Sequence, residues 1–281
     1  MPIPKALTIA GSDSGGGAGI QADLKTFAAF GVYGCSVITA ITAQNTRQVT
    51  GIEPISPEMV RKQLEAVLSD IRPDVVKVGM LANASIVRAV ASSLDRERRI
   101  PLVLDPVMVS KSGDALMAEG SATALRELLF PLADLITPNI PEAEALTGKT
   151  LKTDQDFEEA ARDLHSMGVR AVLLKGGHRP EFQSEAHLDP REVVDLLYDG
   201  REFYSIRGPW VNTPHTHGTG CTLASAIAAG LAQGLELHPA VLQARAYLTK
   251  ALDAGFSIGQ GISPVHHFHH WWTGSRVGFG E

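Results

Sequence analysis

The clearest chemical pattern in the chain is a glycine-rich turn that contains a cysteine. Gly218-Thr219-Gly220-Cys221-Thr222 runs directly into an apolar segment, Leu223 to Ala232, which predicts a buried helix. Glycines before a helix leave its first backbone N–H groups open to a ligand, and the helix dipole favours negative charge there. The same field would favour the thiolate of Cys221. The turn therefore predicts an anion site with a base or nucleophile, against the alternative of an inert packed cysteine.

Several other polar or glycine positions follow runs that predict strands: Gly11, Gln44, Gly79, Asp105, Asn139, Glu142 and Lys175. In a parallel sheet the carboxyl ends of the strands share one edge, so these residues are expected to meet there. Together they supply what phosphoryl transfer from ATP requires. Glu142 and Asp105 suit the role of oxygen ligands for Mg²⁺ and its waters, Lys175 that of a cation for the phosphates, and Gly218 to Cys221 that of backbone donors. Cys221 would act as a base on the acceptor hydroxyl.

The elements that must position these residues alternate between short apolar runs and amphipathic segments. Strands are predicted at 7–10, 35–42, 75–79, 102–106, 135–138 and 171–175, and helices at 20–30, 57–71, 83–94, the later part of 114–130, 139–146, 154–167 and 239 to about 258. A hairpin is predicted around Asp199-Gly200, between the runs 193–198 and 202–206. The alternation predicts a mostly parallel sheet with helices on both faces, in one domain over residues 1–281.

The composition sets limits on the class of protein. The 281 residues are 44% hydrophobic and 20% charged, with a formal net charge of −6, which is typical of a globular chain and argues against a nucleic-acid partner. No apolar run approaches the roughly 20 residues of a membrane span, and the first ten residues lack the pattern of a signal peptide. Two cysteines do not make a disulfide framework. A cytoplasmic protein is therefore expected.

Three further patterns are weaker. The glycine loop 11–19 between a strand and a helix is compatible with a dinucleotide site, but no acidic residue ends the next strand, and Asp23 lies in the helix instead. Asp23 either faces a small ligand or is solvated. Thr147-Gly-Lys-Thr150 resembles the end of a P-loop but lacks the first glycine of that motif. The segment 264–272 holds four histidines, for which a packed segment anchored by Trp271 and Trp272 is favoured over a metal site.

The motifs also carry a resemblance that covers nearly the whole chain. The sequence is similar to the hydroxymethylpyrimidine (phosphate) kinases of thiamine biosynthesis, in the ribokinase-like superfamily. The similar segments are Ala10-Gly-Ser-Asp-Ser-Gly-Gly-Gly-Ala-Gly-Ile-Gln-Ala-Asp23, Thr39-Ala-Ile-Thr-Ala-Gln-Asn-Thr46, Lys77-Val-Gly-Met80, Leu104-Asp-Pro-Val-Met108, Thr137-Pro-Asn-Ile-Pro-Glu142, Lys175-Gly-Gly-His178, Thr216-His-Gly-Thr-Gly-Cys221 and Pro264-Val-His-His-Phe268. The stretch 179–191 matches poorly and is interpreted as a surface insertion.

The resemblance implies a doubly wound, three-layered fold, a homodimer, and two successive ATP- and Mg²⁺-dependent phosphorylations of an aminopyrimidine alcohol at one site. It places the pyrimidine contacts at Gly11, Asp23, Gln44, Met80 and Val107. The ATP side is placed at Asn139, Glu142, Lys175 and Thr219, with Asp105 and Glu142 toward the metal. Catalysis is assigned to Cys221 with Gly218, Gly220 and Lys175. Most sugar and nucleoside kinases of the superfamily have an aspartate where this chain has Cys221.

Three other functions fit parts of the sequence. A pyridoxal (vitamin B6) kinase shares the scaffold, although Gln44 and Met80 favour the pyrimidine. A non-catalytic binding protein would not need Lys175, Glu142 and Cys221 together. A dehydrogenase would need an acidic residue for the ribose, which the chain lacks at the expected position.

His215 and His217 can orient Cys221, contact phosphate or cap the turn. The segments 11–19 and 107–114 are candidates for loops that close over the substrate.

Overall fold

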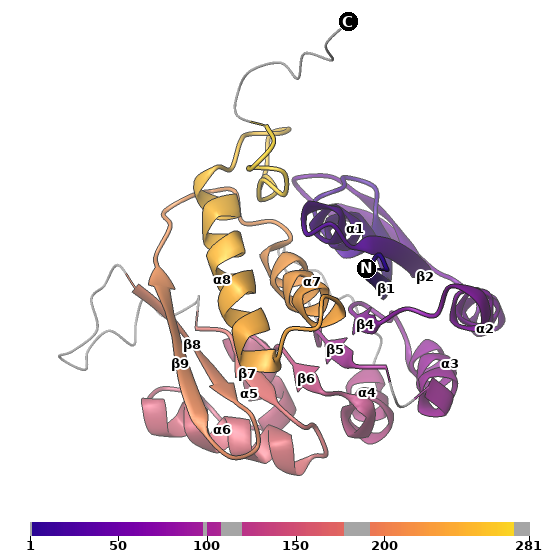
Figure 1. Ribbon diagram of the computed structural model, residues 1–281, viewed down its shortest axis with the longest axis horizontal. Helices are drawn as coiled ribbons and strands as arrows, with labels where there is room; N and C mark the ends of the chain where they lie inside the picture. The colour runs from indigo at the N-terminus through magenta and orange to yellow at the C-terminus, as the bar shows by residue number, and fades with distance from the viewer. Residues whose placement is uncertain (1, 98–99, 108–119, 177–191, 273–281) are drawn as a thin grey trace, which may run out of the picture.

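One mixed β-sheet forms the centre of the computed structural model, which describes residues 2–97, 100–107, 120–176 and 192–272 (Figure 1). The strand order is β3-β2-β1-β4-β5-β6-β7-β8-β9. The strands span β1 (Lys5–Asp13), β2 (Tyr33–Gln44), β3 (Val49–Pro54), β4 (Val75–Val78), β5 (Leu102–Leu104), β6 (Leu135–Ile136), β7 (Val172–Leu174), β8 (Glu192–Tyr198) and β9 (Phe203–Pro209). The predicted α/β class, a mostly parallel sheet, is confirmed.

The sheet is parallel from β2 through β7 and antiparallel at both edges. The late hairpin of β8 and β9 was predicted from Asp199-Gly200, and Gly200 has a positive φ of 91°. The other edge strand, β3, was not predicted. It is mostly exposed, and contains Gly51 and Pro54, so it has no apolar pattern. Its antiparallel pairing with the end of β2 provides the stabilisation instead.

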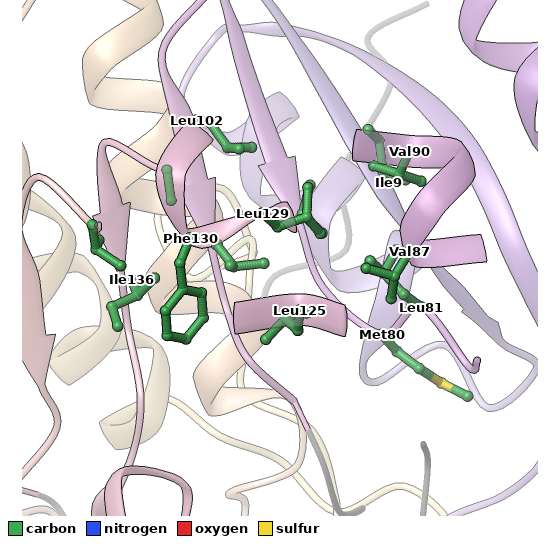
Figure 2. Close-up of a cluster of buried hydrophobic side chains, with 14 of the residues drawn as sticks. Ile9, Met80, Leu81, Val87, Val90, Leu102, Leu125, Leu129, Phe130 and Ile136 are labelled. Atoms are coloured by element: carbon green, nitrogen blue, oxygen red, sulfur yellow. The ribbon is translucent and has the colours of Figure 1, made fainter. Parts of the chain in front are cut away.

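Helices cover both faces of the sheet (Figure 1). On one face, α1 (Gly19–Ala29), α7 (Thr219–Ala232) and α8 (Leu237–Asp253) share a buried cluster that includes Phe27, Ile227 and Leu248. On the other face lie α2 (Pro57–Ala66), α3 (Ala84–Leu94), α4 (Ser121–Leu128), α5 (Ile140–Thr147) and α6 (Asp154–Ser166). Figure 2 shows part of this second cluster, in which Val87, Leu125 and Phe130 gather around strand residues.

Most helix boundaries agree with the predictions because the expected capping residues are in place. The Asn83 side chain accepts hydrogen bonds from the backbone of Ser85 and Ile86 at the start of α3. A π-helical turn (Val67–Ile71) continues α2 to the predicted end. The helix α8 ends at Asp253, earlier than expected. Gly148 ends α5 with φ 72°, so the P-loop-like tetrapeptide is a helix terminus. The segment 108–119, the start of the helix expected from 114, and the insertion 179–191 lie outside the described residues.

The histidine-rich C-terminal segment is packed mainly through its buried histidines. Trp271 and Trp272 are 58% and 52% exposed, whereas His266 and His267 are buried. Trp272 contacts Phe256 and His266, but the two half-exposed tryptophans are not the main anchors that were predicted. His267 Nε2 lies 3.1 Å from the Thr222 hydroxyl, and burial lowers the pKa of His267 to about 3, so its ring packs as a neutral group. Within the described ranges, no group of three or more His, Cys, Asp or Glu side chains is placed to hold a metal ion.

In the described part of the chain, no helix has both the length and the apolar character that crossing a membrane requires.

The small residues of α7 let α8 approach it closely, and this contact yields a test of the packing. A Cβ placed on Gly230 would lie 3.0 Å from Ala240 Cβ. We expect Gly230→Val to lower the free energy of unfolding by about 1–3 kcal/mol, because the added methyl groups must push the helices apart. Ala246→Val, on the exposed face of α8, is the matched control and should cost less than about 1 kcal/mol. Urea denaturation of both variants measures the difference, and equal losses would contradict this packing.

Candidate active site

A cavity of about 410 Å³ opens at the carboxyl edge of the parallel strands. It is lined by residues from both ends of the chain and from the middle of the sheet. Most of the residues that the sequence assigned to a site line this cavity: Gly11, Gln44, Met80, Asp105, Val107, Asn139, Glu142, Lys175, Gly218, Thr219, Gly220 and Cys221. The exceptions are Asp23 and Gly79. The convergence follows from the topology, because these residues lie near the carboxyl end of a strand or in the first turn of a helix.

The turn before α7 is held against the glycine loop that follows β1. Gly218 is the N-cap residue of α7 and has a φ of 77°. A Cβ at this position would overlap the carbonyl group of Gly17, so only glycine allows the two backbones to approach so closely. The backbone N–H of Gly19 also donates to the sulfur of Cys221. The open N–H groups of the first turn of α7 therefore point into the cavity beside the thiol.

Lys175 lies between two carboxylates and also borders the turn before α7. Its Nζ is 3.0 Å from Asp105 Oδ1 and 3.9 Å from Glu142 Oε2. Burial opposes the charge of Lys175, but Asp105 and Glu142 raise its pKa above the ordinary value, so the side chain is a cation at neutral pH. A Cβ on Gly220 would lie 3.3 Å from Lys175 Nζ. The cation and the helix N-terminus therefore converge on the same small space.

Glu142 is held in place by a reciprocal cap at the start of α5. The Asn139 side chain accepts from the Glu142 N–H at 2.9 Å, and Glu142 Oε2 accepts from the Asn139 N–H at 2.8 Å. This is the capping-box arrangement, and it satisfies two backbone donors at once. Asp105 is fixed in a similar way, because the Thr137 hydroxyl donates to its Oδ1 at 3.0 Å. Both carboxylates thus have defined positions beside Lys175.

Asp23 does not line the cavity, which corrects the prediction that it contacts a ligand. Its side chain is fully buried and is 2.9 Å from the Nζ of Lys77 through both oxygens. Hydroxyl groups of Thr8 and Ser225 also donate to Asp23, at 2.6 and 2.7 Å. Burial opposes the charge of Lys77, but Asp23 raises the pKa of Lys77 above its usual range. Asp23 therefore neutralises the charge of Lys77, which lines the cavity.

Cys221 is a thiol in the free protein. Burial raises the pKa of Cys221 to about 11, and the nearby charge of Lys77 offsets only part of this effect. Burial therefore disfavours the thiolate that the helix N-terminus was expected to favour.

One side of the cavity lies at the ends of β1, β2 and β4, and its lining includes the Gln44 amide and apolar groups. Gln44 is the last residue of β2, and its side chain contacts the Thr42 hydroxyl and the His217 ring. Met80, just after β4, is 8% exposed and lies at the margin of the cluster in Figure 2. A Cβ on Gly11 would lie 3.0 Å from the Met80 sulfur. Gly11 thus leaves room for the Met80 side chain, and the two form an apolar wall next to the amide.

The opposite side of the cavity was largely missed by the sequence reasoning. It is lined by β8, by the segment that follows β9, and by one face of α8: Val193, Asp195, Pro209, Trp210, Val211, Asn212, Thr213, Arg245, Leu248 and Leu252. The last three are spaced as one face of a helix, but the same spacing is expected for core residues. Three of these residues, Val211, Asn212 and Thr213, lie in the stretch 211–217 directly before the glycine turn, and this closeness in sequence was the available signal.

The chain is similar to known proteins over most of its length. The family model described as phosphomethylpyrimidine kinase matches residues 13–266. The chain is 48% identical over 268 residues to the hydroxymethylpyrimidine/phosphomethylpyrimidine kinase of Bacillus subtilis, covering 95% of this chain and 96% of that protein. It is 52% identical over 268 residues to the thiamine biosynthesis bifunctional protein ThiED of Geobacter sulfurreducens. In that case 95% of this chain is covered, but the match spans only 53% of the longer protein.

The fold is also similar to solved structures. An ADP complex of Bacillus subtilis pyridoxal kinase superimposes with a TM-score of 0.85 and is 39% identical, with 95% of this chain and 98% of that chain covered. The ribokinase-like fold that the resemblance implied is therefore confirmed. The pyridoxal kinase is less similar in sequence than the two thiamine-pathway proteins are.

The buried pair beneath the cavity yields a direct test. We expect Asp23→Ala to lower the free energy of unfolding by about 3–5 kcal/mol, because it leaves the charge of Lys77 buried without a partner. Glu58→Ala removes one member of the exposed Glu58–Lys62 pair and should cost less than about 1 kcal/mol. Replacing both buried partners, with Asp23→Leu and Lys77→Met, should cost less than Asp23→Ala alone. Chemical denaturation measures all three, and a loss for Asp23→Ala as small as that for Glu58→Ala would contradict the assignment.

Proposed function

Because the chain belongs to the phosphomethylpyrimidine kinase family, we propose that the two sides of its cavity hold the two substrates of a phosphoryl transfer. The activity is the ATP-dependent phosphorylation of 4-amino-5-hydroxymethyl-2-methylpyrimidine, and then of its monophosphate, in thiamine biosynthesis. The observation that carries the division of the cavity is the strand order. Gln44 ends β2 and Trp210 follows β9, and between them lies Lys175, which follows β7 and borders the α7 turn.

The pyrimidine is assigned to the side formed by Gly11, Gln44, Met80 and Val107. An aminopyrimidine edge presents a ring-nitrogen acceptor beside an amino donor, and a carboxamide such as that of Gln44 complements both groups. Met80 supplies a polarizable apolar surface for the ring. This placement directs the hydroxymethyl group toward Cys221 and the first turn of α7.

ATP is assigned to the side formed by β8, the segment after β9 and α8. Apolar groups such as Val193, Trp210 and Leu248 suit a nucleobase. From there the phosphates would extend toward Lys175 and Thr219, where a cation and backbone N–H groups can balance their charge. Asn139 and Glu142 border this path.

In the transfer, the hydroxymethyl oxygen forms a bond to the γ-phosphorus, and the bond from that phosphorus to the β–γ bridging oxygen breaks. ADP carries away the electron pair of the broken bond. Lys175 and the N–H groups of the α7 turn stabilise the charge on the transferred group. The acceptor proton leaves toward the Cys221 sulfur, for which the thiolate is the active form. In the second step the acceptor is a phosphate oxygen that is already anionic.

Asp105 and Glu142 are the residues that would hold Mg²⁺. Mg²⁺ usually keeps several waters and binds through one or two carboxylates together with substrate phosphates. Two fixed carboxylates beside Lys175 fit that pattern. When bound, the ion would neutralise charge on the phosphate oxygens.

The location and assembly of the protein are part of the same proposal. Both cysteines are free thiols, as is usual for cytoplasmic proteins, and the phosphoryl donor is a cytoplasmic metabolite. We propose a cytoplasmic homodimer without a nucleic-acid partner.

The proposed activity is tested by measuring ADP release from ATP and Mg²⁺ with each acceptor in turn. We expect release with the aminopyrimidine alcohol and with its monophosphate, and loss of both when EDTA removes the metal. Lys175→Met should reduce both rates, because the charge on the transferred group loses its cation. No acceptor-dependent ADP release by the wild-type protein would contradict the proposal.

The role of Cys221 predicts a difference between the two phosphorylations. We expect Cys221→Ala to slow the first step by about 10²–10⁴-fold, the usual contribution of a general base, and to affect the second step much less. The part of the first rate that depends on Cys221 should rise by about tenfold per pH unit from pH 7 to 9, because the thiolate fraction increases below a pKa of about 11. Single-turnover rates measure both effects. Equal losses in the two steps would show that Cys221 is not the base.

Pyridoxal phosphorylation is the second candidate activity, and the similarity to the Bacillus subtilis pyridoxal kinase structure supports it. Pyridoxal lacks the aminopyrimidine edge that Gln44 complements. We therefore expect kcat/KM to be higher for the aminopyrimidine alcohol than for pyridoxal when both are assayed with ATP. The reverse order would assign the site to pyridoxal.

A further inference from the structure

His217 lies where three separate segments of the chain meet beside the cavity. Its Nε2 is 2.9 Å from Asp13 Oδ2 and 3.4 Å from Gln44 Nε2. Its backbone N–H donates to the Ser263 carbonyl at 3.1 Å. The residue thus connects the glycine loop, the end of β2 and the C-terminal segment, and its neighbour Gly218 begins the catalytic turn.

The Asp13 carboxylate determines which nitrogen of His217 carries a proton. Asp13 already accepts hydrogen bonds from the backbone N–H groups of Gly15, Gly17 and Ala18. Burial opposes its ionised form, but the hydrogen bond from His217 and these backbone donors lower the pKa of Asp13 below its usual value. An ionised carboxylate only accepts hydrogen bonds, so the His217 Nε2 that faces it must carry the hydrogen.

This proton has a consequence for the amide of Gln44. With its nitrogen toward His217, the Gln44 NH₂ group faces another donor. On its other side, the single hydroxyl hydrogen of Thr42 is shared between the Ser12 carbonyl at 3.0 Å and Gln44 Oε1 at 3.1 Å. A half-turn of the amide removes the contact between two donors and leaves the Thr42 hydrogen to Ser12, and only the hydrogen-bond network decides between the two orientations. The single Nε2 hydrogen of His217 is then shared, with Asp13 Oδ2 as the nearer acceptor and Gln44 Oε1 as the farther one. Gln44 NH₂ donates to Thr42, and Thr42 donates to Ser12.

We propose that His217 is a positioning residue that fixes the Gln44 amide with its oxygen toward His217 and its NH₂ group toward Thr42, and thereby sets the preference of the site for an aminopyrimidine. The inference rests on the proposed function, because it assigns Gln44 to the substrate. An amide with fixed ends offers a donor and an acceptor in one spatial order. A substrate edge with the matching order is accepted, and an edge with a missing or reversed group leaves polar atoms unpaired.

The surroundings of the His217 ring are suited to this role because they prevent the ring from turning. A Cβ on Gly17 would overlap the ring, and Pro264 pairs with His217 in a short β-bridge. The ring is therefore enclosed by the glycine loop on one side and by the C-terminal segment on the other. This packing holds the Nε2–H group of His217 in one direction.

The experiment compares three variants by calorimetric titration with two ligands, in the absence of ATP. The ligands are the aminopyrimidine alcohol and its analogue without the amino group, 5-hydroxymethyl-2-methylpyrimidine. The preference of the site is the Kd of the analogue divided by the Kd of the aminopyrimidine alcohol. We expect His217→Leu to reduce this ratio by about tenfold or more, because the amide can then turn. We expect His217→Gln to retain most of the ratio, because its amide nitrogen can donate to both Asp13 and Gln44. His215→Gln is the matched control, since His215 packs on Gly255 and is not among the cavity-lining residues.

A double-variant comparison separates positioning from packing. If His217 acts through Gln44, then His217→Leu should not change the ratio further in a Gln44→Ala background. An unchanged ratio in His217→Leu, or equal weakening for both ligands, would overturn the proposal. So would an equal change of the ratio with and without Gln44. A wild-type protein that neither binds nor phosphorylates the aminopyrimidine alcohol would instead refute the proposed function.

Discussion

The ion pair between Lys77 and Asp23 is the interaction on which the site depends. Both side chains are fully buried, and taking two charges out of water is costly unless each is paired and hydrogen-bonded. The pair meets this requirement by drawing on four elements: Lys77 from β4, Asp23 from α1, Thr8 from β1 and Ser225 from α7. The hydrogen bond from Ser225 to Asp23 thus couples the position of α7 to this buried ion pair. The first turn of α7 carries Cys221 and lies directly above this network.

A second constraint acts on the same turn from the outside. A side chain at Gly218 would overlap the carbonyl group of Gly17, and a side chain at Gly17 would overlap the His217 ring. Asp13 and His217 add a charged contact across this junction. The turn is therefore held from beneath by the buried pair and from the side by the glycine loop. Such preorganised backbone donors do not have to reorganise when charge develops on a transferred group, which is the main source of electrostatic catalysis.

Much of this arrangement could be predicted from the sequence, because it follows from periodicity and topology. Strand ends collect polar residues at one edge of a parallel sheet, and this alone brought Gln44, Lys175 and Cys221 together. Other features depend on three-dimensional packing. An acidic residue one turn into a helix can face a ligand or a buried lysine, and only the structure pairs Asp23 with Lys77. The face of α8 that contains Leu248 and Leu252 has the spacing of ordinary core residues. The high pKa of Cys221 arises from burial, which the glycine turn does not reveal.

The α7 turn is proposed to separate a pyrimidine side from a nucleotide side within one cavity. A crystal structure with the aminopyrimidine alcohol and a non-hydrolysable ATP analogue would show this division. We expect the amino edge of the pyrimidine at Gln44 and the nucleobase near Trp210 and Leu248. The terminal phosphate should lie at the N–H groups of Gly218 to Cys221, with the hydroxymethyl oxygen beside the Cys221 sulfur. A nucleobase bound against Gln44 and Met80, or a pyrimidine bound outside this cavity, would contradict it.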